Sequence, residues 1–407
     1  MKCRHCAHEL QQSFVDLGVM PPSNAYLNHK SMFDNECSYP LKVLVCNYCW
    51  LVQTKDFTRA EELFTPDYAY FSSISSSWLH HAKCHVDRLI HERALDNNSF
   101  VVELASNDGY LLQNFVQQKI PCLGVEPTAA SASVAREKGI DVKETFFGLE
   151  IANVITEQYS KPDVVIANNV LAHVPDINDF VLGLAVLLSE NSVATLEFPH
   201  LLNLIELNQF DTIYHEHFSY LSLIAINNVF TKAGLEIFDV EKIATHGGSL
   251  RVWVQKKQGK ESIKPSVNLL LEEERRFGID SLETYTSFTK QVDQVVQGFK
   301  SFLQNVKAEG KSIVAYGAAA KGNTLLNCAG VNQKDIQAVF DAAPSKQNKW
   351  LPGSHIPILA PHKLTEFKPD YVLILPWNIA DEIIPAIREK VPEHCQFVVA
   401  VPEIKLL

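Results

Sequence analysis

Short apolar runs alternate with helical patterns through the middle of the chain, and this alternation is typical of an α/β sheet. The first run, residues 101–104, ends in the small polar residues 106–109, and a helical pattern starts at Tyr110. Gly109 would let the backbone approach a ligand, and the following helix N-terminus offers unpaired N–H groups. Because ligands of doubly wound folds bind at the carboxyl ends of strands, we predict a binding turn here. An ordinary β–α turn without a ligand is the alternative interpretation.

The second apolar run, residues 123–126, ends in Glu126, about 20 residues beyond the turn, where a carboxylate meets the ribose hydroxyls of a bound nucleoside. The turn lacks the third glycine of a dinucleotide fingerprint, and Ala105 and Asn107 stand where many methyltransferases have glycines. A site for S-adenosylmethionine (SAM) has no pyrophosphate to hold, so it tolerates these residues. The acids Glu103 and Glu126 around the turn therefore favour SAM over NAD.

Further apolar runs complete the pattern of a SAM-dependent methyltransferase sheet. Buried strands are predicted at residues 163–167 and 192–198, and a closing antiparallel pair at residues 235–240 and 250–255. Helical patterns accompany these strands at residues 78–95, 131–138 and 222–233.

A second, smaller unit of the same type begins near residue 310, with strands predicted at residues 312–316, 338–340 and 370–375. The glycine turn 317–324 resembles a phosphate-binding loop with a lysine, although its spacing excludes a Walker motif. A nucleoside diphosphate would suit this turn, and a purely structural repeat of the fold is the alternative. Between the two units, residues 264–309 predict long amphipathic helices that carry their run of acids on a solvated face.

Four of the nine cysteines form two pairs near the N-terminus, Cys3 with Cys6 and Cys46 with Cys49. Each pair can hold an ion from a tight turn, and two pairs complete a tetrahedral thiolate shell that suits zinc. Because protein atoms would fill all four positions, we expect a structural site and not a catalytic one. The long segment between the pairs must then carry structure of its own. Buried or redox-active cysteines are the alternative.

Composition and charge limit the partners. The 407 residues predict two or three domains, and 46% hydrophobic with 20% charged residues is ordinary for a globular protein. The net charge of −11 argues against nucleic acid or an anionic membrane as the main partner. No apolar run reaches about 18 residues, and the N-terminus has no signal-peptide core. We expect a cytoplasmic protein that spans no membrane, while its oligomeric state stays open.

Residues 214–220 hold the densest group of proton-transfer side chains in the chain, two histidines, an acid and two tyrosines, at the predicted ligand edge of the sheet. A capping loop is one alternative. A metal site of His215 and His217 is a weaker one, because no further ligands are evident nearby. The hydroxyl-rich residues 66–77 directly precede the SAM unit and could fold over the site, with Tyr68 and Tyr70 facing in.

Together these parts resemble the sugar C-methyltransferases of deoxysugar biosynthesis over essentially the whole chain. The motifs that carry the resemblance are CRHC with CNYC, ELASNDGYLL with GVEP, NNVLAHVPD, YHEHFSYLS, HGGSLRVWV, YGAAAKGNTLLN and DAAPSKQNKWLPGSHIPI. The resemblance implies an α/β fold with a central Rossmann-like SAM methyltransferase domain, a small N-terminal zinc-binding domain and a C-terminal Rossmann-like domain. The expected divisions are residues 1–65 for zinc, 66–260 for SAM, 261–309 for a helical connector and 310–407 for the nucleotide-sugar.

In this family a methyl group from SAM is placed on a carbon beside the ketone of a nucleoside-diphosphate 4-keto-deoxysugar. We expect a dTDP-linked 4-keto-6-deoxysugar methylated at C-3, with His217 as the general base and Glu216 orienting or polarising it. The resemblance implies the catalytic residues His217, Glu216, Tyr214, His173 and Tyr68. The expected SAM contacts are Glu103, Ser106, Asn107, Gly109, Glu126 and Asn168. The residues expected near the phosphates are Tyr316, Lys321, Asn323 and Lys346.

Three other functions would use the same features. An NAD-dependent nucleotide-sugar dehydrogenase or epimerase would use the Rossmann-like units, although neither turn carries G-x-G-x-x-G. An O- or N-methyltransferase would need no base that removes a carbon-bound proton. A non-catalytic zinc-containing scaffold would bind SAM or a nucleotide-sugar without turnover, and the dense histidine and tyrosine cluster argues against it.

Overall fold

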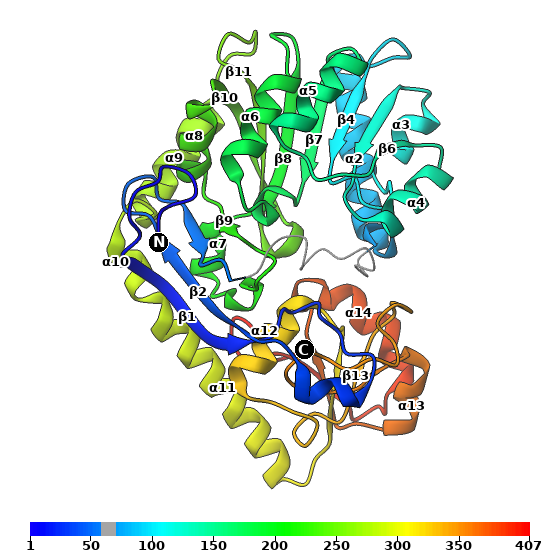
Figure 1. Cartoon of the computed structure of the whole chain (residues 1–407). Coiled ribbons are helices and arrows are strands. Elements are labelled where there is room, and N and C mark those ends of the chain that lie inside the picture. Colours follow the sequence, from blue (N-terminus) through cyan, green and yellow to red (C-terminus); the bar gives the residue numbers. More distant parts are fainter. Residues whose placement is uncertain (58–70) are drawn as a thin grey trace.

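The computed structural model describes residues 1–57 and 71–407, and their strands lie in three sheets. A seven-stranded sheet fills the upper half of the molecule in Figure 1, and a six-stranded sheet fills the lower half. A four-stranded sheet that begins with the N-terminal strands lies along one side of both. The α/β architecture predicted from the sequence is therefore confirmed.

The central sheet has the strand order of a doubly wound methyltransferase fold, with one antiparallel strand near its edge. In spatial order its strands are β10 (Leu235–Ile243), β11 (Ser249–Lys256), β8 (Val193–Pro199), β7 (Val164–Asn168), β4 (Val101–Leu104), β5 (Cys122–Val125) and β6 (Asp141–Lys143). Every residue of β4 and β7 is buried, because helices cover both faces of the sheet. Continuous apolar runs and not alternating patterns therefore mark these two strands.

Two sets of helices cover the two faces of this sheet. One face packs against α5 (Leu149–Gln158), α6 (Ile177–Leu187) and α8 (Leu223–Lys232). The other packs against α2 (Ser76–Arg93), residues of the turn and helix around α3 (Gln113–Gln117), and α4 (Ala129–Glu137). The predicted antiparallel pair is present as β10 with β11 at the end of the sheet.

The C-terminal sheet is parallel except for its last strand. In spatial order its strands are β14 (Ile358–Leu359), β13 (Val339–Phe340), β12 (Ile313–Tyr316), β15 (Tyr371–Ile374), β16 (Gln396–Val399) and β17 (Lys405–Leu406). Its helices are α12 (Ala320–Ala329), α13 (Leu364–Phe367) and α14 (Ala380–Ile387). The three strands predicted in this unit are β12, β13 and β15.

The N-terminal sheet takes a strand from elsewhere in the chain. It consists of β1 (Gln12–Met20), β2 (Tyr39–Val45), β3 (Val52–Thr54) and β9 (Ser219–Tyr220). Phe14 of β1 stacks on Phe288, with ring centroids 4.5 Å apart, at the start of the long helix α11 (Phe288–Ala308). The helical connector thus packs against the N-terminal sheet. The expected divisions at residues 65, 260 and 309 stay predictions.

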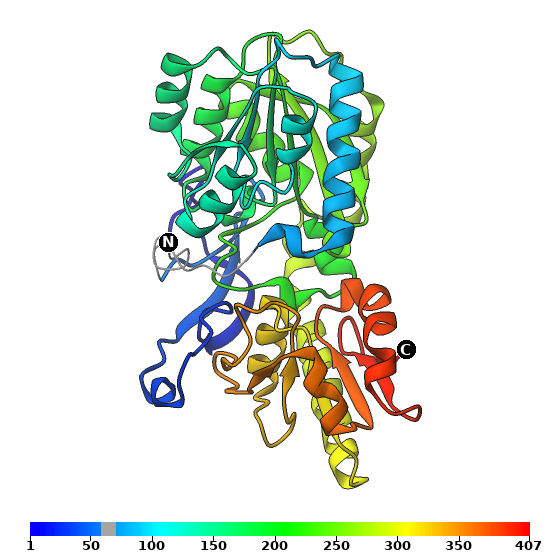
Figure 2. The same cartoon turned by 90° about the vertical axis from the view of Figure 1, so that its right-hand side faces the viewer.

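Residues 21–37 run from β1 across to the C-terminal domain, and Figure 2 shows this segment in blue beside that domain. The Glu36 carboxylate accepts hydrogen bonds from the Gly353 N–H, at 3.0 and 3.1 Å, and lies 3.0 Å from His355 Nε2. Leu27 pairs with Trp350 in an isolated bridge. The segment between the two cysteine pairs therefore carries structure of its own, as the sequence predicts.

The remaining helices, α7 (Leu201–Glu206), α9 (Pro265–Phe277) and α10 (Leu282–Thr286), join these parts, and α9 departs from one prediction. Glu274, in its run of acids, is not on a solvated face but wholly buried. Its carboxylate accepts from the Leu223 and Ile224 N–H groups, at 2.7 and 2.8 Å, and lies 2.7 Å from His200 Nε2. Glu274 thus satisfies N–H groups at the start of α8 that helix geometry leaves unpaired.

We predict that Glu274→Ala lowers the free energy of unfolding by about 2–4 kcal/mol, because buried donors lose their acceptor where no water replaces it. Glu274→Gln keeps one acceptor oxygen and should lose less. The exposed neighbour Glu272 provides a matched control, and Glu272→Ala should change stability by less than about 0.5 kcal/mol. Urea unfolding followed by circular dichroism measures all three, and equal losses for both alanine variants would contradict the capping role.

Candidate active site

The predicted SAM contacts gather at the carboxyl ends of three neighbouring strands. Ser106, Asn107 and Gly109 follow β4, Glu126 follows β5, and Asn168 ends β7. Because the sheet order places β4 between β7 and β5, these residues share one edge of the sheet.

The turn after β4 has a backbone that brings its N–H groups toward this edge. Asn107 and Gly109 have positive φ angles of 48° and 75°, a conformation that asparagine and glycine tolerate. A Cβ at Gly109 would lie 2.3 Å from the Ile140 side chain, so the close approach needs glycine.

Glu126 is held by the turn that it faces. Its carboxylate accepts from the Asn107 N–H and the Thr128 N–H, both at 2.9 Å, and from the Thr128 hydroxyl. Burial raises the pKa of Glu126, while the Thr128 and Asn107 hydrogen bonds oppose the rise. The carboxylate is thus oriented at the point where ribose hydroxyls of a nucleoside would lie.

Buried polar atoms without partners mark where a ligand fits. Among the described residues, three buried side-chain atoms at this edge have no hydrogen-bond partner: Asn168 Nδ2, Asn168 Oδ1 and Ser106 Oγ. Unsatisfied buried groups are costly, so a polar ligand at this edge would stabilise them. The amide, hydroxyl and carboxylate donors and acceptors here match the amino acid and ribose parts of SAM.

Glu103 lies deeper than the other predicted SAM contacts. It is wholly buried within β4, and burial raises the pKa of its carboxyl well above the ordinary range, against the hydrogen bond from Tyr110. The charges of Glu126 and Asp108 raise it further. Glu103 therefore lies inside the sheet, before the turn that carries the other predicted contacts.

The described end of the hydroxyl-rich loop contacts the same turn. The Ser72 N–H donates to Asn107 Oδ1 at 2.9 Å, and the Ser73 hydroxyl donates to Asp108 Oδ2. Trp78, at the start of α2, stacks on Tyr110 with ring centroids 5.8 Å apart. Tyr68 and Tyr70 lie outside the described residues.

His217 is buried, and its hydrogen-bond partners determine which of its two ring nitrogens carries the proton. Its Nδ1 lies 2.8 Å from the Thr212 carbonyl oxygen, which requires a proton on Nδ1, and its Nε2 lies 2.9 Å from the Tyr214 hydroxyl. Burial lowers the pKa of His217 well below its usual range, with His173, His246 and Lys321 adding to the shift. The imidazole is therefore neutral near pH 7, with a lone pair on Nε2.

His173 forms a second neutral imidazole beside the first. The ring centroids of His173 and His217 lie 4.6 Å apart. The Nδ1 of His173 lies 2.8 Å from the Glu216 backbone carbonyl oxygen, and burial lowers the pKa of His173 to about 4. With its proton on Nδ1, the neutral ring presents Nε2 as an acceptor.

Glu216 orients different groups from the one expected. Its carboxylate accepts from the backbone N–H and side-chain Nδ2 of Asn24, at 3.2 and 3.1 Å, while its backbone carbonyl holds His173. The described contacts of the His217 ring nitrogens are instead the Thr212 carbonyl and the Tyr214 hydroxyl. The Thr212 backbone carbonyl therefore orients His217 in this structure, in place of the expected Glu216 side chain.

The neighbouring His215 faces another direction. Its Nε2 lies 3.2 Å from the Tyr39 carbonyl oxygen, and its ring packs edge-on against Tyr39. A shared metal site with His217 finds no support among the described residues, where the four cysteines form the one group with metal-binding geometry.

The four residues expected near phosphates have different surroundings. Lys321 Nζ donates to Asn378 Oδ1 at 2.6 Å and lies 4.6 Å above the Trp377 ring. Lys346 Nζ donates to the Ala318 carbonyl at 2.9 Å, and Tyr316 ends β12 nearby in the chain. Asn323 is wholly buried, and its amide donates to the Ser23 carbonyl at 2.6 Å. Because this face of α12 packs on the N-terminal segment, Asn323 holds that segment and not an exposed anion.

The two cysteine pairs meet as predicted. The sulfur atoms of Cys3, Cys6, Cys46 and Cys49 all lie within 4.8 Å of one another. Cys3 and Cys49 are 3.5 Å apart, as are Cys6 and Cys46, close to the roughly 3.8 Å between sulfurs on a tetrahedral zinc ion. Four closely grouped thiols fit a structural zinc site.

This cluster is connected to the segment that carries His217. Gln53 of β3 donates its side-chain amide to Cys3 Sγ at 3.2 Å. The next residue, Thr54, donates its backbone N–H to the Phe218 carbonyl at 3.1 Å and its hydroxyl to the His217 carbonyl at 3.3 Å. The zinc domain thus supports the backbone of the predicted base.

Known proteins match the chain along its whole length. A family model described as a zinc-binding domain matches residues 3–64, one described as a methyltransferase domain matches residues 78–240, and one described as a C-methyltransferase C-terminal domain matches residues 244–402. The C-methyltransferase NovU of Streptomyces niveus is 34% identical over 406 residues, which cover 100% of this chain and 96% of that protein. The chain belongs to the sugar C-methyltransferase family.

Solved structures match part of this C-methyltransferase at low identity. Magnesium protoporphyrin IX methyltransferase of Synechocystis PCC 6803, with bound SAM, is 16% identical, and the match covers 44% of this chain and 79% of that chain with a TM-score of 0.34. A SAM-dependent methyltransferase of Clostridium acetobutylicum is 14% identical, and the match covers 44% of this chain and 91% of that chain with a TM-score of 0.35.

Family membership decides between the predicted functions. The protein is a SAM-dependent C-methyltransferase with a zinc-binding domain. The dehydrogenase or epimerase, the O- or N-methyltransferase and the non-catalytic scaffold are therefore not retained. No helix of the described residues is both long and apolar enough to cross a membrane.

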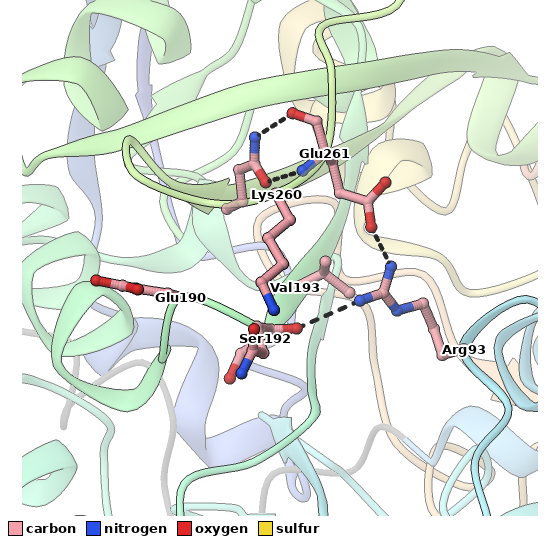
Figure 3. A pocket seen from close by; sticks show the side chains of 8 residues that line it. Arg93, Glu190, Ser192, Val193, Lys260 and Glu261 are labelled. Atoms are coloured by element: carbon pink, nitrogen blue, oxygen red, sulfur yellow. Dashed lines mark hydrogen bonds and ion pairs between the residues drawn. The ribbon is translucent and has the colours of Figure 1, made fainter.

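A pocket of about 300 Å³ lies at the wrong end of the sheet to be the active site of this C-methyltransferase. Figure 3 shows Val193, the first residue of β8, beside Arg93, the last residue of α2. The Arg93 guanidinium pairs with Glu261 across this pocket. These residues mark the amino ends of the strands, whereas the predicted SAM contacts lie at the carboxyl ends.

His246 is a residue of this site that the sequence did not single out. It occupies the β10–β11 turn with a φ of 56°, rare for a side chain of this size, and its Nε2 lies 3.2 Å from Asn169 Nδ2. Its ring lies 5.1 Å from Trp78, and burial lowers the pKa of His246 to about 4. Only its place in the motif HGGSLRVWV marked it, because the contact with Asn169 joins distant segments.

We predict that the double variant Cys46→Ser/Cys49→Ser loses the zinc ion that the native C-methyltransferase holds at one per chain, measured by mass spectrometry of the metal. Without the ion, β3 loses its anchor beside the predicted base, so turnover should fall at least tenfold, while SAM affinity changes less than threefold. Cys37→Ser, at an exposed cysteine, is the control that should keep both. One zinc ion per chain in the double variant would remove these cysteines from the site.

Proposed function

We propose that the enzyme transfers the SAM methyl group to the carbon beside the ketone of a nucleoside-diphosphate 4-keto-6-deoxysugar, dTDP-linked and methylated at C-3. The observation that carries the proposal is the buried, neutral His217 with its lone pair on Nε2. Methylation of a carbon needs a base that first removes a carbon-bound proton, and a neutral imidazole in a site closed to water serves that purpose near pH 7.

The hydrogen bonds of His217 prepare it for this role. The Thr212 carbonyl keeps the proton on Nδ1, so only Nε2 can accept a proton from the sugar. The electron pair of the broken C–H bond enters the carbon–carbon bond, and negative charge collects on the ketone oxygen. SAM, when bound, supplies an activated methyl group for the resulting carbon nucleophile.

Tyr214 is the side chain best placed to stabilise the developing charge. Its hydroxyl lies 2.9 Å from Nε2, and a hydroxyl that turns to donate to the ketone oxygen would free the Nε2 lone pair for the sugar proton. His173, neutral with its proton on Nδ1, would accept from a sugar hydroxyl. Tyr68 stays in the proposal on the family resemblance alone.

The diphosphate would be held by the C-terminal domain. Burial lowers the pKa of Lys321, and the charge of Asp211 opposes that shift. Lys346 Nζ lies 3.8 Å from Asp341 Oδ2. We propose Lys321, Lys346 and Tyr316 as substrate contacts, and we leave Asn323 out because its amide is used by Ser23. For SAM we propose Ser106, Asn107, Gly109, Glu126 and Asn168, with Glu103 buried in the strand before them.

We predict that Glu126→Gln weakens SAM binding by about 10- to 100-fold, because an amide replaces the charged acceptor for the ribose hydroxyls. Titration calorimetry of the purified full-length protein measures the affinity. The exposed Glu144, paired with Arg136 on the surface, is the matched control, and Glu144→Gln should bind SAM as the native protein does. Equal affinities of both variants would move the ribose site elsewhere.

We predict that His217→Asn folds and binds SAM but loses about 10²–10⁴-fold in turnover, because no group then accepts the ring proton of the sugar. Mass spectrometry with SAM and a panel of dTDP- and GDP-4-keto-6-deoxysugars measures the methylated product, and NMR locates the methyl group. Exchange of the ring proton with deuterated solvent should vanish as well. His215→Asn, in the same loop, should keep turnover within about threefold.

The pH profile provides an independent check of the same base. Only the deprotonated imidazole accepts a proton, and the pKa of His217 is lowered. The value of kcat/KM should therefore stay level as the pH falls to 6.5 and decline only at lower pH. A loss of activity with a midpoint at or above pH 6.5, or near-native turnover of His217→Asn, would assign the base to another residue.

A further inference from the structure

The segment before the predicted base is bonded to the C-terminal domain on both sides of the carbonyl that holds the base. Trp377 Nε1 donates to Asp211 Oδ2 at 2.7 Å, and the Thr324 hydroxyl of α12 donates to the Ile213 carbonyl at 2.9 Å. The carbonyl between them, that of Thr212, accepts from His217 Nδ1 at 2.8 Å. The C-terminal domain therefore fixes the backbone immediately before and after the Thr212 carbonyl.

These bonds are shielded from water. Asp211 and Thr324 are wholly buried, so water does not replace a partner that is removed. Burial raises the pKa of Asp211 to about 6, against the opposing effects of Lys321 and of the Trp377 hydrogen bond. The carboxylate is thus ionised near pH 7 and accepts a charge-assisted hydrogen bond from the indole.

The position of Trp377 is itself closely determined. Its ring carries Lys321 above one face, with Nζ 4.6 Å from the ring. A Cβ on Gly247 would lie 2.5 Å from the indole, so the β10–β11 turn touches it directly. Gln209, just before the segment, donates to the Gly247 carbonyl at 2.7 Å. The indole therefore joins the C-terminal domain, the β10–β11 turn and the segment 209–213 at one point.

We propose that Trp377 and Thr324 are positioning residues for the general base: they hold residues 211–213 so that the Thr212 carbonyl keeps the proton of His217 on Nδ1. The inference rests on the proposed function, in which His217 Nε2 accepts the sugar proton. Its consequence is that the domain proposed to bind the nucleotide also fixes the reactive nitrogen of the base in the neighbouring domain.

The test uses the full-length chain with Thr324→Val, which removes one hydroxyl donor, and Trp377→Phe, which keeps a ring but removes the indole N–H. Each should lower kcat about 10- to 100-fold with the KM for SAM within twofold, because the base and not the cofactor edge is displaced. Trp253→Phe is the matched control. This variant also removes an indole N–H that donates to a carboxylate, here Glu241 at 2.9 Å. It should leave kcat within twofold.

A second readout observes the imidazole without any reaction. In the full-length protein labelled with ¹⁵N-histidine, the NMR signals of His217 are those that His217→Asn removes. We expect the Nδ1–H form in the native protein, and in Trp377→Phe and Thr324→Val faster exchange of that proton with solvent and a measurable fraction of the Nε2–H form. Thr324→Val exchanges groups of equal size, so it keeps the test valid if Trp377→Phe fails to fold.

The outcomes separate the inference from the proposed function. Unchanged His217 signals in both variants would overturn the positioning role, whether or not kcat falls. Shifted signals with a lower kcat would support it. If His217→Asn kept its turnover, the base assignment would fail, while the NMR signals would still report whether Trp377 and Thr324 orient the imidazole.

Discussion

The hydrogen bond from His217 Nδ1 to the Thr212 carbonyl is the interaction on which the chemistry proposed for this enzyme depends. It leaves the lone pair on Nε2, and burial keeps that nitrogen deprotonated. The loop that makes the bond also has partners outside the central domain. Thr54 holds its later half from the zinc domain, and Trp377 holds its earlier half from the C-terminal domain. All three domains therefore hold the loop of the proposed base, whereas the predicted SAM contacts belong to the central domain alone.

Features that depend on neighbouring residues could be predicted from the sequence. The buried strands β4 and β7 gave continuous apolar runs because helices cover both faces, and the cysteine pairs gave a metal site because each pair is a local turn. Strands of two or three residues, such as β9 and β14, are too short to show a period. The grouping of the predicted SAM contacts at one edge of the sheet was predictable for the same local reason, since these residues directly follow the ends of strands.

Features that depend on contacts between distant segments could not be predicted. Glu216 meets Asn24 from 192 positions away, and no spacing in either segment signals that bond. Asn323 stands in a glycine-rich turn typical of phosphate sites, yet its helix face packs on the N-terminal segment. Glu274 belongs to a run of acids that normally marks a solvated face, yet it caps another helix. The sequence of a segment shows which polar groups it carries, whereas tertiary packing decides which partners those groups bind.

The lowered pKa of His217 has a chemical cost that the same surroundings offset. Burial and nearby positive charge keep the imidazole neutral, but they also make it a weaker base toward a carbon-bound proton. In the proposed reaction, negative charge then develops on the ketone oxygen of the substrate, where electrostatic stabilisation away from water is strong. Lys321 contributes to the lowered pKa of His217, and its positive charge favours negative charge on that oxygen. The Tyr214 hydroxyl could donate a hydrogen bond to the same oxygen. The positive charge of Lys321, which weakens His217 as a base, would therefore stabilise the enolate that proton transfer forms. This explains why a lysine of the C-terminal domain near a histidine of the central domain would favour the proposed reaction.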